Sequence, residues 1–149
     1  LFSADREKYI EFCKRENHKT LLGYGLALSP EQLAAVDKEI AKLMSLTVPW
    51  DPPKTVKPKR PGIDKEEPMY AYKLKQEADG RLYKFTSSKF KTYFVMSTNC
   101  VLLADTIVGA AGTDILSVRG FISPGTYQDY LDKEFERPHS LVVTKRVYQ

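Results

Sequence analysis

Apolar residues recur at helical spacing in the segment that follows Ser29 and Pro30. They stand three or four positions apart, as on one buried face of an α-helix: Leu33, Val36, Ile40, Leu43 and Met44. Ser29 is a favourable N-cap, Pro30 suits the first helical position, and Gln32 stands where a capping-box side chain reaches back. The pattern predicts a helix from Pro30 to about Ser45.

Spacing and capping residues predict three further helices. They are a short amphipathic helix over residues 3–14 with Ser3 as its cap, an apolar helix over residues 101–108, and a helix introduced by Ser123 and Pro124 that buries Tyr127, Tyr130, Leu131 and Phe135. Segments rich in alternating, β-branched or aromatic residues predict strands over residues 19–28, 69–75, 81–85, 91–96 and 140–148.

The segments 69–75 and 81–85 are separated by a turn that contains Asp79 and Gly80. Polar and apolar residues alternate in both segments, which predicts a β-hairpin. The chain shows no internal repeat. Together the elements predict an α+β fold with a mainly antiparallel sheet and packed helices.

Residues 48–68 differ in composition from the rest of the chain. The segment carries six prolines, at positions 49, 52, 53, 58, 61 and 68, and a basic cluster made of Lys54, Lys57, Lys59 and Arg60. It lacks the apolar residues to fold alone, so we expect an irregular or mobile surface loop. The lysines could neutralise phosphates, but acidic residues interrupt them and no nucleic-acid-binding motif is present, so nucleic acid is not an expected partner.

Length and composition indicate one globular domain over residues 1–149. The chain is 42% hydrophobic and 11% aromatic, which is enough to close a single core. Its net charge of +4 permits an acidic partner without requiring one. No apolar run approaches the roughly 18 residues of a transmembrane helix, so we expect a soluble chain.

The chain contains two cysteines, Cys13 and Cys100, in dissimilar surroundings. They show no metal-ligand spacing, and we expect neither a metal nor a cofactor. Cys13 lies on the apolar face of the first predicted helix and is interpreted as a packing residue. The sequence leaves a disulfide between the two open.

Cys100 stands where the apolar helix begins, directly after a predicted strand. Thr98 or Asn99 would be the N-cap, which leaves Cys100 in the first turn. There the free backbone N–H groups and the helix dipole stabilise a thiolate, so this position can supply a nucleophile. The alternative interpretation is a small buried hydrophobic residue beside an apolar helix.

Two features resemble the permuted papain-like superfamily, which includes the NlpC-type cell-wall peptidases and the lecithin:retinol acyltransferase-like enzymes. One is the Asn99-Cys100 pair that opens an apolar helix, and the other is the later run Ile122-Ser123-Pro124-Gly125-Thr126-Tyr127 that introduces a second helix. The resemblance covers about a quarter of the chain. It implies a papain-like fold and thiol-dependent hydrolysis or transfer of an acyl or peptidyl group, with peptide, peptidoglycan or lipid acyl substrates and Cys100 as the nucleophile.

The chain has two histidines that could act as the base, His18 and His139. In permuted members the histidine precedes the cysteine, which favours His18, although Lys19 and Thr20 follow it instead of small apolar residues. In the non-permuted order the histidine follows, as His139 does. A third alternative is a base that preceded Leu1. The chain does not begin with methionine, and a cleaved signal would indicate the bacterial periplasm or secretion.

The competing function class is a non-enzymatic binding module. It would use the basic, tyrosine-rich surface of the predicted hairpin and the loop over residues 48–68. Asp105 is the carboxylate nearest to Cys100 in the sequence, and we expect its side chain to face solvent.

Overall fold

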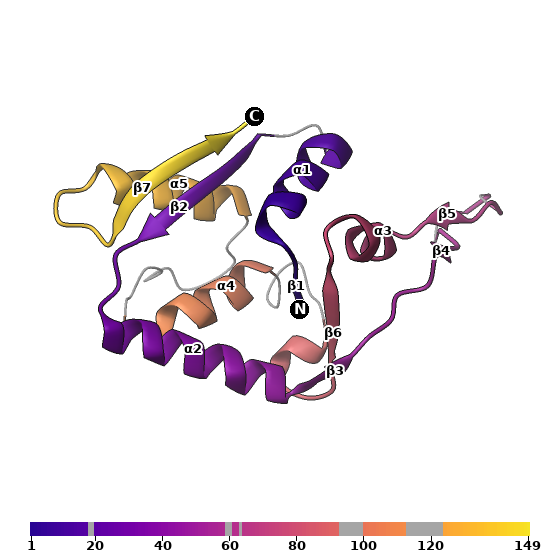
Figure 1. Ribbon diagram of the computed structural model, residues 1–149, viewed down its shortest axis with the longest axis horizontal. Coiled ribbons are helices and arrows are strands. Elements are labelled where there is room, and N and C mark those ends of the chain that lie inside the picture. Colours follow the sequence, from indigo (N-terminus) through magenta and orange to yellow (C-terminus); the bar gives the residue numbers. More distant parts are fainter. Residues whose placement is uncertain (18–19, 59–60, 63, 93–99, 113–123) are drawn as a thin grey trace. The chain divides into compact units, whose positions relative to one another are not determined.

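The computed structural model describes the chain except for residues 18–19, 59–60, 63, 93–99 and 113–123 (Figure 1). Its described part contains five α-helices and small antiparallel sheets, which confirms the predicted α+β class. The chain divides into two compact units, each assembled from segments that are distant in sequence.

Unit 1 comprises Leu1–Leu21, Val48–Lys84 and Tyr148–Gln149. It contains most of a three-stranded sheet in the order β1-β6-β3, which is formed by β1 (Phe2–Ser3), β6 (Arg81–Phe85) and β3 (Thr47–Pro49). β1 and β6 are antiparallel, with Phe2 opposite Leu82. The unit also contains α1 (Arg6–Asn17), α3 (Tyr70–Glu77) and the antiparallel pair β4 (Thr55–Val56) and β5 (Glu67–Pro68).

The core of unit 1 lies between α1 and α3. Phe12 and Cys13 from α1 pack with Leu74 and Ala78, and all four side chains are at most 2% exposed. Ion pairs border this core, with Arg15 bound to Glu77 at 2.9 Å and Lys73 bound to Glu16 at 3.1 Å. Because the two helices supply the apolar contacts together, neither face is buried without the other.

The predicted hairpin over residues 69–75 and 81–85 is wrong in its first strand. Residues Tyr70–Glu77 form α3, whereas Arg81–Phe85 form β6 as expected. Tyr70, Leu74 and Ala78 are four residues apart and therefore share one helical face, where Tyr70 meets the Phe12 ring and the other two are buried. The period of two along the segment was misleading because the same residues also fit a helical period. The turn at Asp79 and Gly80 is present.

Residues 48–68 are mostly exposed and irregular in their described part. The short β4–β5 pair interrupts this segment, with Thr55 opposite Pro68. The Thr55 hydroxyl donates to Glu66 at 2.6 Å. Pro52 is buried, so the segment is attached to unit 1 near its start.

Unit 2 comprises Leu22–Thr47 and Phe85–Val147. It contains α2 (Pro30–Ser45), α4 (Cys100–Gly109), α5 (Pro124–Glu136), the 3-10 helix η1 (Lys89–Lys91), and most of β2 (Leu21–Leu26) and β7 (Val142–Tyr148). β2 and β7 pair with each other and run in opposite directions (Figure 1). The terminal strand, the strand after residue 19 and the helices at 30, 101 and 124 are therefore confirmed.

The start of α2 shows the predicted capping box. The Ser29 hydroxyl accepts from the Gln32 backbone at 3.1 Å, and the Gln32 side chain accepts from the Ser29 backbone at 2.9 Å. Buried side chains of unit 2 come from distant segments: Leu43, Phe85, Val101, Ala111 and Val142. Contacts of α4 with α2 and with α5 join the helices of this unit.

Three smaller expectations differ from the structure. Ser3 belongs to β1, and Asp5 caps α1 instead, since its carboxylate accepts from the Lys8 backbone at 2.9 Å. Phe135 is 41% exposed, not buried. Lys91 ends η1, so it is not part of a strand, and the rest of the expected strand over residues 93–96 lies outside the described residues.

Candidate functional site

Cys100 is the first residue of α4, and its side chain is exposed. The expectation that this cysteine lies in the first turn of a helix is confirmed. Thr98 and Asn99, the two predicted N-caps, lie outside the described residues. The next residue, Val101, is only 5% exposed, so burial of its side chain fixes the start of the helix in the core of unit 2.

The first turn of α4 carries backbone N–H groups that point away from the helix body. In an α-helix the first four N–H groups lack an intrahelical acceptor. Together with the helix dipole they favour a negative charge at this end, such as a thiolate or an oxyanion.

α4 is held by both neighbouring helices of unit 2. At its carboxyl end the Gln32 side chain of α2 donates to the Ala111 carbonyl at 3.3 Å. On the side of α5, burial and then the charge of Asp105 raise the pKa of Tyr127. Asp105 is half-buried, which corrects the expectation that its side chain simply faces solvent.

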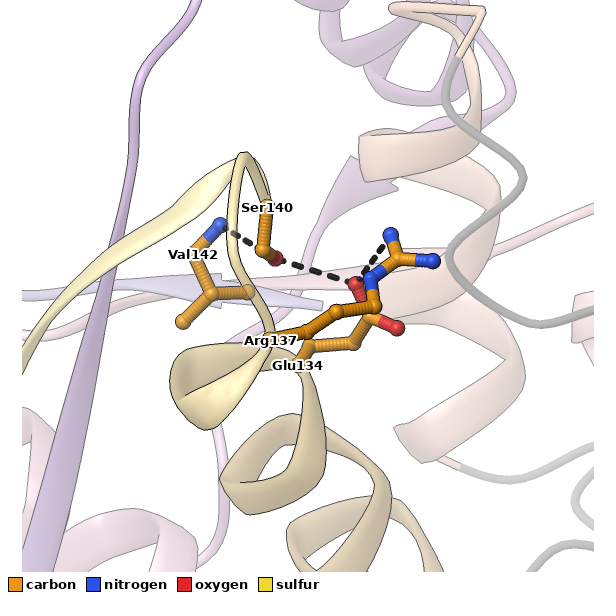
Figure 2. Close-up of polar contacts among 4 residues, drawn as sticks. All are labelled: Glu134, Arg137, Ser140 and Val142. Atoms are coloured by element: carbon orange, nitrogen blue, oxygen red, sulfur yellow. Dashed lines mark hydrogen bonds and ion pairs between the residues drawn. The ribbon is translucent and has the colours of Figure 1, made fainter.

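His139 lies in the turn between α5 and β7, and its side chain is exposed. Its backbone has a positive φ of 61°, in the left-handed region, where histidine is one of the better-tolerated residues other than glycine. Figure 2 shows the contacts that fix this turn. Glu134 accepts from Arg137 at 2.8 Å and from the Ser140 hydroxyl at 3.0 Å, and Ser140 accepts from the Val142 backbone at 3.2 Å.

The structure does not join Cys100 to His139 by a hydrogen bond within the described residues. Two residues after His139, the Leu141 carbonyl accepts a hydrogen bond from the Ala27 backbone at 2.9 Å. This bond connects the chain after the turn to the segment that leads into α2. The beginning of α2 in turn contacts Ala111, just beyond the end of α4. Cys100 is at the opposite end of this ten-residue helix, about 14 Å away along its axis. His18 lies outside the described residues.

A polar cluster that the sequence analysis missed connects three elements of unit 2. The Asp132 carboxylate of α5 accepts from the Tyr24 hydroxyl of β2 at 2.6 Å and from the Lys145 ammonium of β7 at 2.5 Å. The ammonium also lies 5.8 Å from the centre of the Tyr24 ring. Since 108 positions separate Tyr24 from Asp132, no local signal in the sequence indicates this cluster.

The cluster shifts the titration of two of its members. Burial, followed by the hydrogen bond to Asp132, raises the pKa of Tyr24 to about 12. Hydrogen bonds from Lys145 and Tyr24 lower the pKa of Asp132. A phenol that is held protonated while it donates to a carboxylate is suited to fixing α5 on the strand pair, and we assign the cluster that structural role.

Cys13 is 2% exposed in the core of unit 1, as expected for a packing residue. Burial and then a hydrogen bond with Cys13 raise the pKa of the neighbouring Tyr9. Both cysteines are free, so the open question of a disulfide between them is settled against it.

The described part of the chain shows neither a candidate metal-binding group nor a candidate membrane-spanning helix. No three His, Cys, Asp or Glu side chains in it are grouped so that they could hold a metal ion. None of its helices is both long enough and apolar enough to span a bilayer. Comparison of the chain with protein-family models, with curated proteins and with solved structures finds no match.

Proposed function

We propose that the chain is a thiol-dependent hydrolase or acyl transferase of the permuted papain-like type, with Cys100 as its nucleophile. The observation that carries the proposal is that an exposed cysteine is the first residue of α4. A thiol at this position is accessible to a substrate and lies at the positive end of the helix dipole. The substrates would contain amide or ester bonds, in a peptide, in peptidoglycan or in a lipid.

The chemistry follows from the groups at the start of α4. The Cys100 sulfur, after loss of its proton to a histidine, attacks the carbonyl carbon and forms a tetrahedral oxyanion that accepts hydrogen bonds from the backbone N–H groups. The bond to the leaving oxygen or nitrogen then breaks, and the histidine returns the proton to that atom. Water or a second acceptor attacks the thioester, which releases the acyl group and restores the thiol.

The choice of the base rests on the order of residues in the resembling family. That order favours His18, which precedes Cys100, over His139. Neutral substitutions at the two positions separate the candidates.

Hydrolysis of p-nitrophenyl acetate tests the proposal. We expect Cys100→Ser to reduce the rate to that of the uncatalysed reaction, while Cys13→Ala retains the activity because Cys13 is buried in the core of unit 1. His18→Gln should lower kcat/KM at least about 100-fold, as for removal of a general base, and His139→Gln should leave it nearly unchanged. Equal rates for the wild type and Cys100→Ser would reject the proposal.

The second candidate function, a non-enzymatic binding module, is favoured by exposed apolar residues beside lysines in unit 1. Val56 and Tyr70 are 44% and 48% exposed. The Lys54 carbonyl accepts from the Met69 backbone at 3.1 Å, which brings the start of α3 next to the β4 segment. The surface is therefore formed by a helix and a loop, and not by the predicted hairpin. Failure of every acyl-transfer test at Cys100, with intact folding, would favour this function.

A further inference from the structure

Unit 1 contains an open pocket of about 410 Å³ at the end of β3 and the beginning of β6. The residues that line it include Trp50, Tyr83, Arg81 and the ion pair of Asp51 and Lys75. A volume of this size is in the range of pockets that hold small organic ligands. All of its lining residues belong to unit 1, so the pocket is complete within that unit.

Backbone contacts connect the walls of the pocket. The Trp50 N–H donates to the Leu82 carbonyl at 2.9 Å, which continues the pairing of β3 with β6 beyond Pro49. At Gly80 a Cβ atom would lie 3.1 Å from the Leu74 carbonyl oxygen and 3.3 Å from the Lys75 Cα atom. A side chain there would be in tight contact with the end of α3, which would have to shift slightly, so glycine suits the close approach at this wall of the pocket.

The charges of the pocket favour an anion. Asp51 and Lys75 neutralise each other. Arg81 is exposed, and its guanidinium forms no ion pair with another residue in the described part of the chain. A guanidinium can donate two parallel hydrogen bonds to a carboxylate, which fixes the orientation of a ligand as well as its charge.

The lining of the pocket also includes two aromatic side chains, Trp50 and Tyr83. Trp50 and Tyr83 are both half-buried, so each still presents part of its ring surface. Aromatic side chains bind planar apolar groups through offset or edge-to-face contacts. We propose that this pocket binds a small aromatic carboxylate, with its ring against Trp50 and Tyr83 and its carboxylate on Arg81. The proposal does not depend on the chemistry of Cys100.

Trp50 is the one tryptophan of the chain, so its fluorescence and its indole N–H resonance report directly on the pocket. We would titrate the full chain with phenylacetate and follow both signals. Saturable changes are expected. Acetate, which lacks the ring, and phenylacetamide, which lacks the charge, should each bind at least about tenfold more weakly, as expected for loss of a charged hydrogen bond or of the apolar contact.

Two matched variants assign the carboxylate contact. Arg81→Gln should weaken phenylacetate binding about tenfold, whereas Lys84→Gln, which removes the same charge from an exposed position on the same strand, should not. Cys100→Ser should bind phenylacetate as the wild type does. No saturable change in either Trp50 signal, equal binding of phenylacetate and phenylacetamide, or equal loss in the Arg81 and Lys84 variants would overturn the proposal.

Discussion

Glu134 is connected to two residues of the turn before β7, Arg137 and Ser140. Its side chain is 15% exposed and accepts hydrogen bonds from both Arg137 and Ser140. Ser140 in turn accepts from the backbone of Val142, whose side chain is buried. Removal of the carboxylate would leave the Ser140 hydroxyl and the Arg137 guanidinium without their shared acceptor.

We therefore expect Glu134→Ala to lower the free energy of unfolding by about 1 kcal/mol, since one partner is largely exposed and its ion pair is weakened by solvent. Urea denaturation measures this value. Glu136→Ala is the matched control, because Glu136 ends the same helix and is exposed. Equal losses for the two variants would show that the turn does not depend on Glu134.

At the residue scale, the position of Cys100 at a helix start was predictable, and the tertiary surroundings of its side chain were not. The helix start depends on local features, namely an apolar run that ends at Gly109. The partners of a nucleophile depend on tertiary contacts. The contacts of the His139 turn with the segment before α2 could not be inferred from spacing, because they join positions that are far apart in the chain.

At the scale of elements, α5 is attached to the β2–β7 pair through the cluster of Tyr24, Asp132 and Lys145. The pKa of Asp132 is lowered in the folded chain, so its charged form stabilises the fold. This contribution is present above the pKa of the unfolded carboxyl and is lost as the pH falls through the lower, folded value.

Asp132→Asn should therefore be less stable than the wild type at neutral pH. Its stability should also decrease less as the pH is lowered. Thermal unfolding followed by circular dichroism at several pH values below neutrality tests this expectation. Asp37→Asn, at an exposed position of α2, is the control and should follow the wild type. A profile for Asp132→Asn that is parallel to that of the wild type would contradict the assignment.

The raised pKa of Tyr24, in the same cluster, predicts that the stability of the fold decreases at high pH. The pKa of Tyr24 is raised from 10.0 to about 12, so its protonated form is favoured in the folded state. The stability that it adds is complete below pH 10.0 and disappears as the pH rises towards about 12. We expect Tyr24→Phe to lose less stability than the wild type over this interval, measured as the change in the midpoint of urea unfolding. Identical alkaline profiles would contradict this role of the phenol.

For some elements the local sequence pattern was enough to predict the structure. α2 was predicted with its boundaries because a capping box and a regular apolar face specify it within its own residues. α3 was not, because Tyr70, Tyr72 and Leu74 stand at every second position, as in a strand, while Tyr70 and Leu74 also share one helical face. The contacts of Tyr70 and Leu74 with α1 decide in favour of the helix, and those contacts are formed only in the folded unit.

At the scale of the whole molecule, the chain forms two compact units, each from segments that are distant in the sequence. The composition of a chain does not indicate which distant segments pack together. The irregular segment after Val48 was recognisable from its prolines, but its short β4–β5 pair was not, because two-residue strands leave no periodic signal.

Limited proteolysis examines this segment in the intact protein. Lys54 and Lys65 are exposed and lie in irregular or weakly paired backbone. Trypsin should cut after these residues first, before it cuts after Lys38 or Lys42, which are exposed but lie within α2. Mass spectrometry of the early fragments identifies the sites. Complete protection of Lys54 and Lys65 would mean that the segment is packed onto its unit.

The central claim is that Cys100 forms a covalent bond to an acyl group. The most direct measurement is the intact mass of the protein during turnover of p-nitrophenyl acetate, followed by peptide mapping. The proposal predicts one acetyl group that appears on Cys100 and disappears as the ester is consumed. The same transient acetylation should occur in Cys13→Ala and should be absent from Cys100→Ser. Acetylation that is unaffected by Cys100→Ser, or found only on lysines and tyrosines, would contradict it.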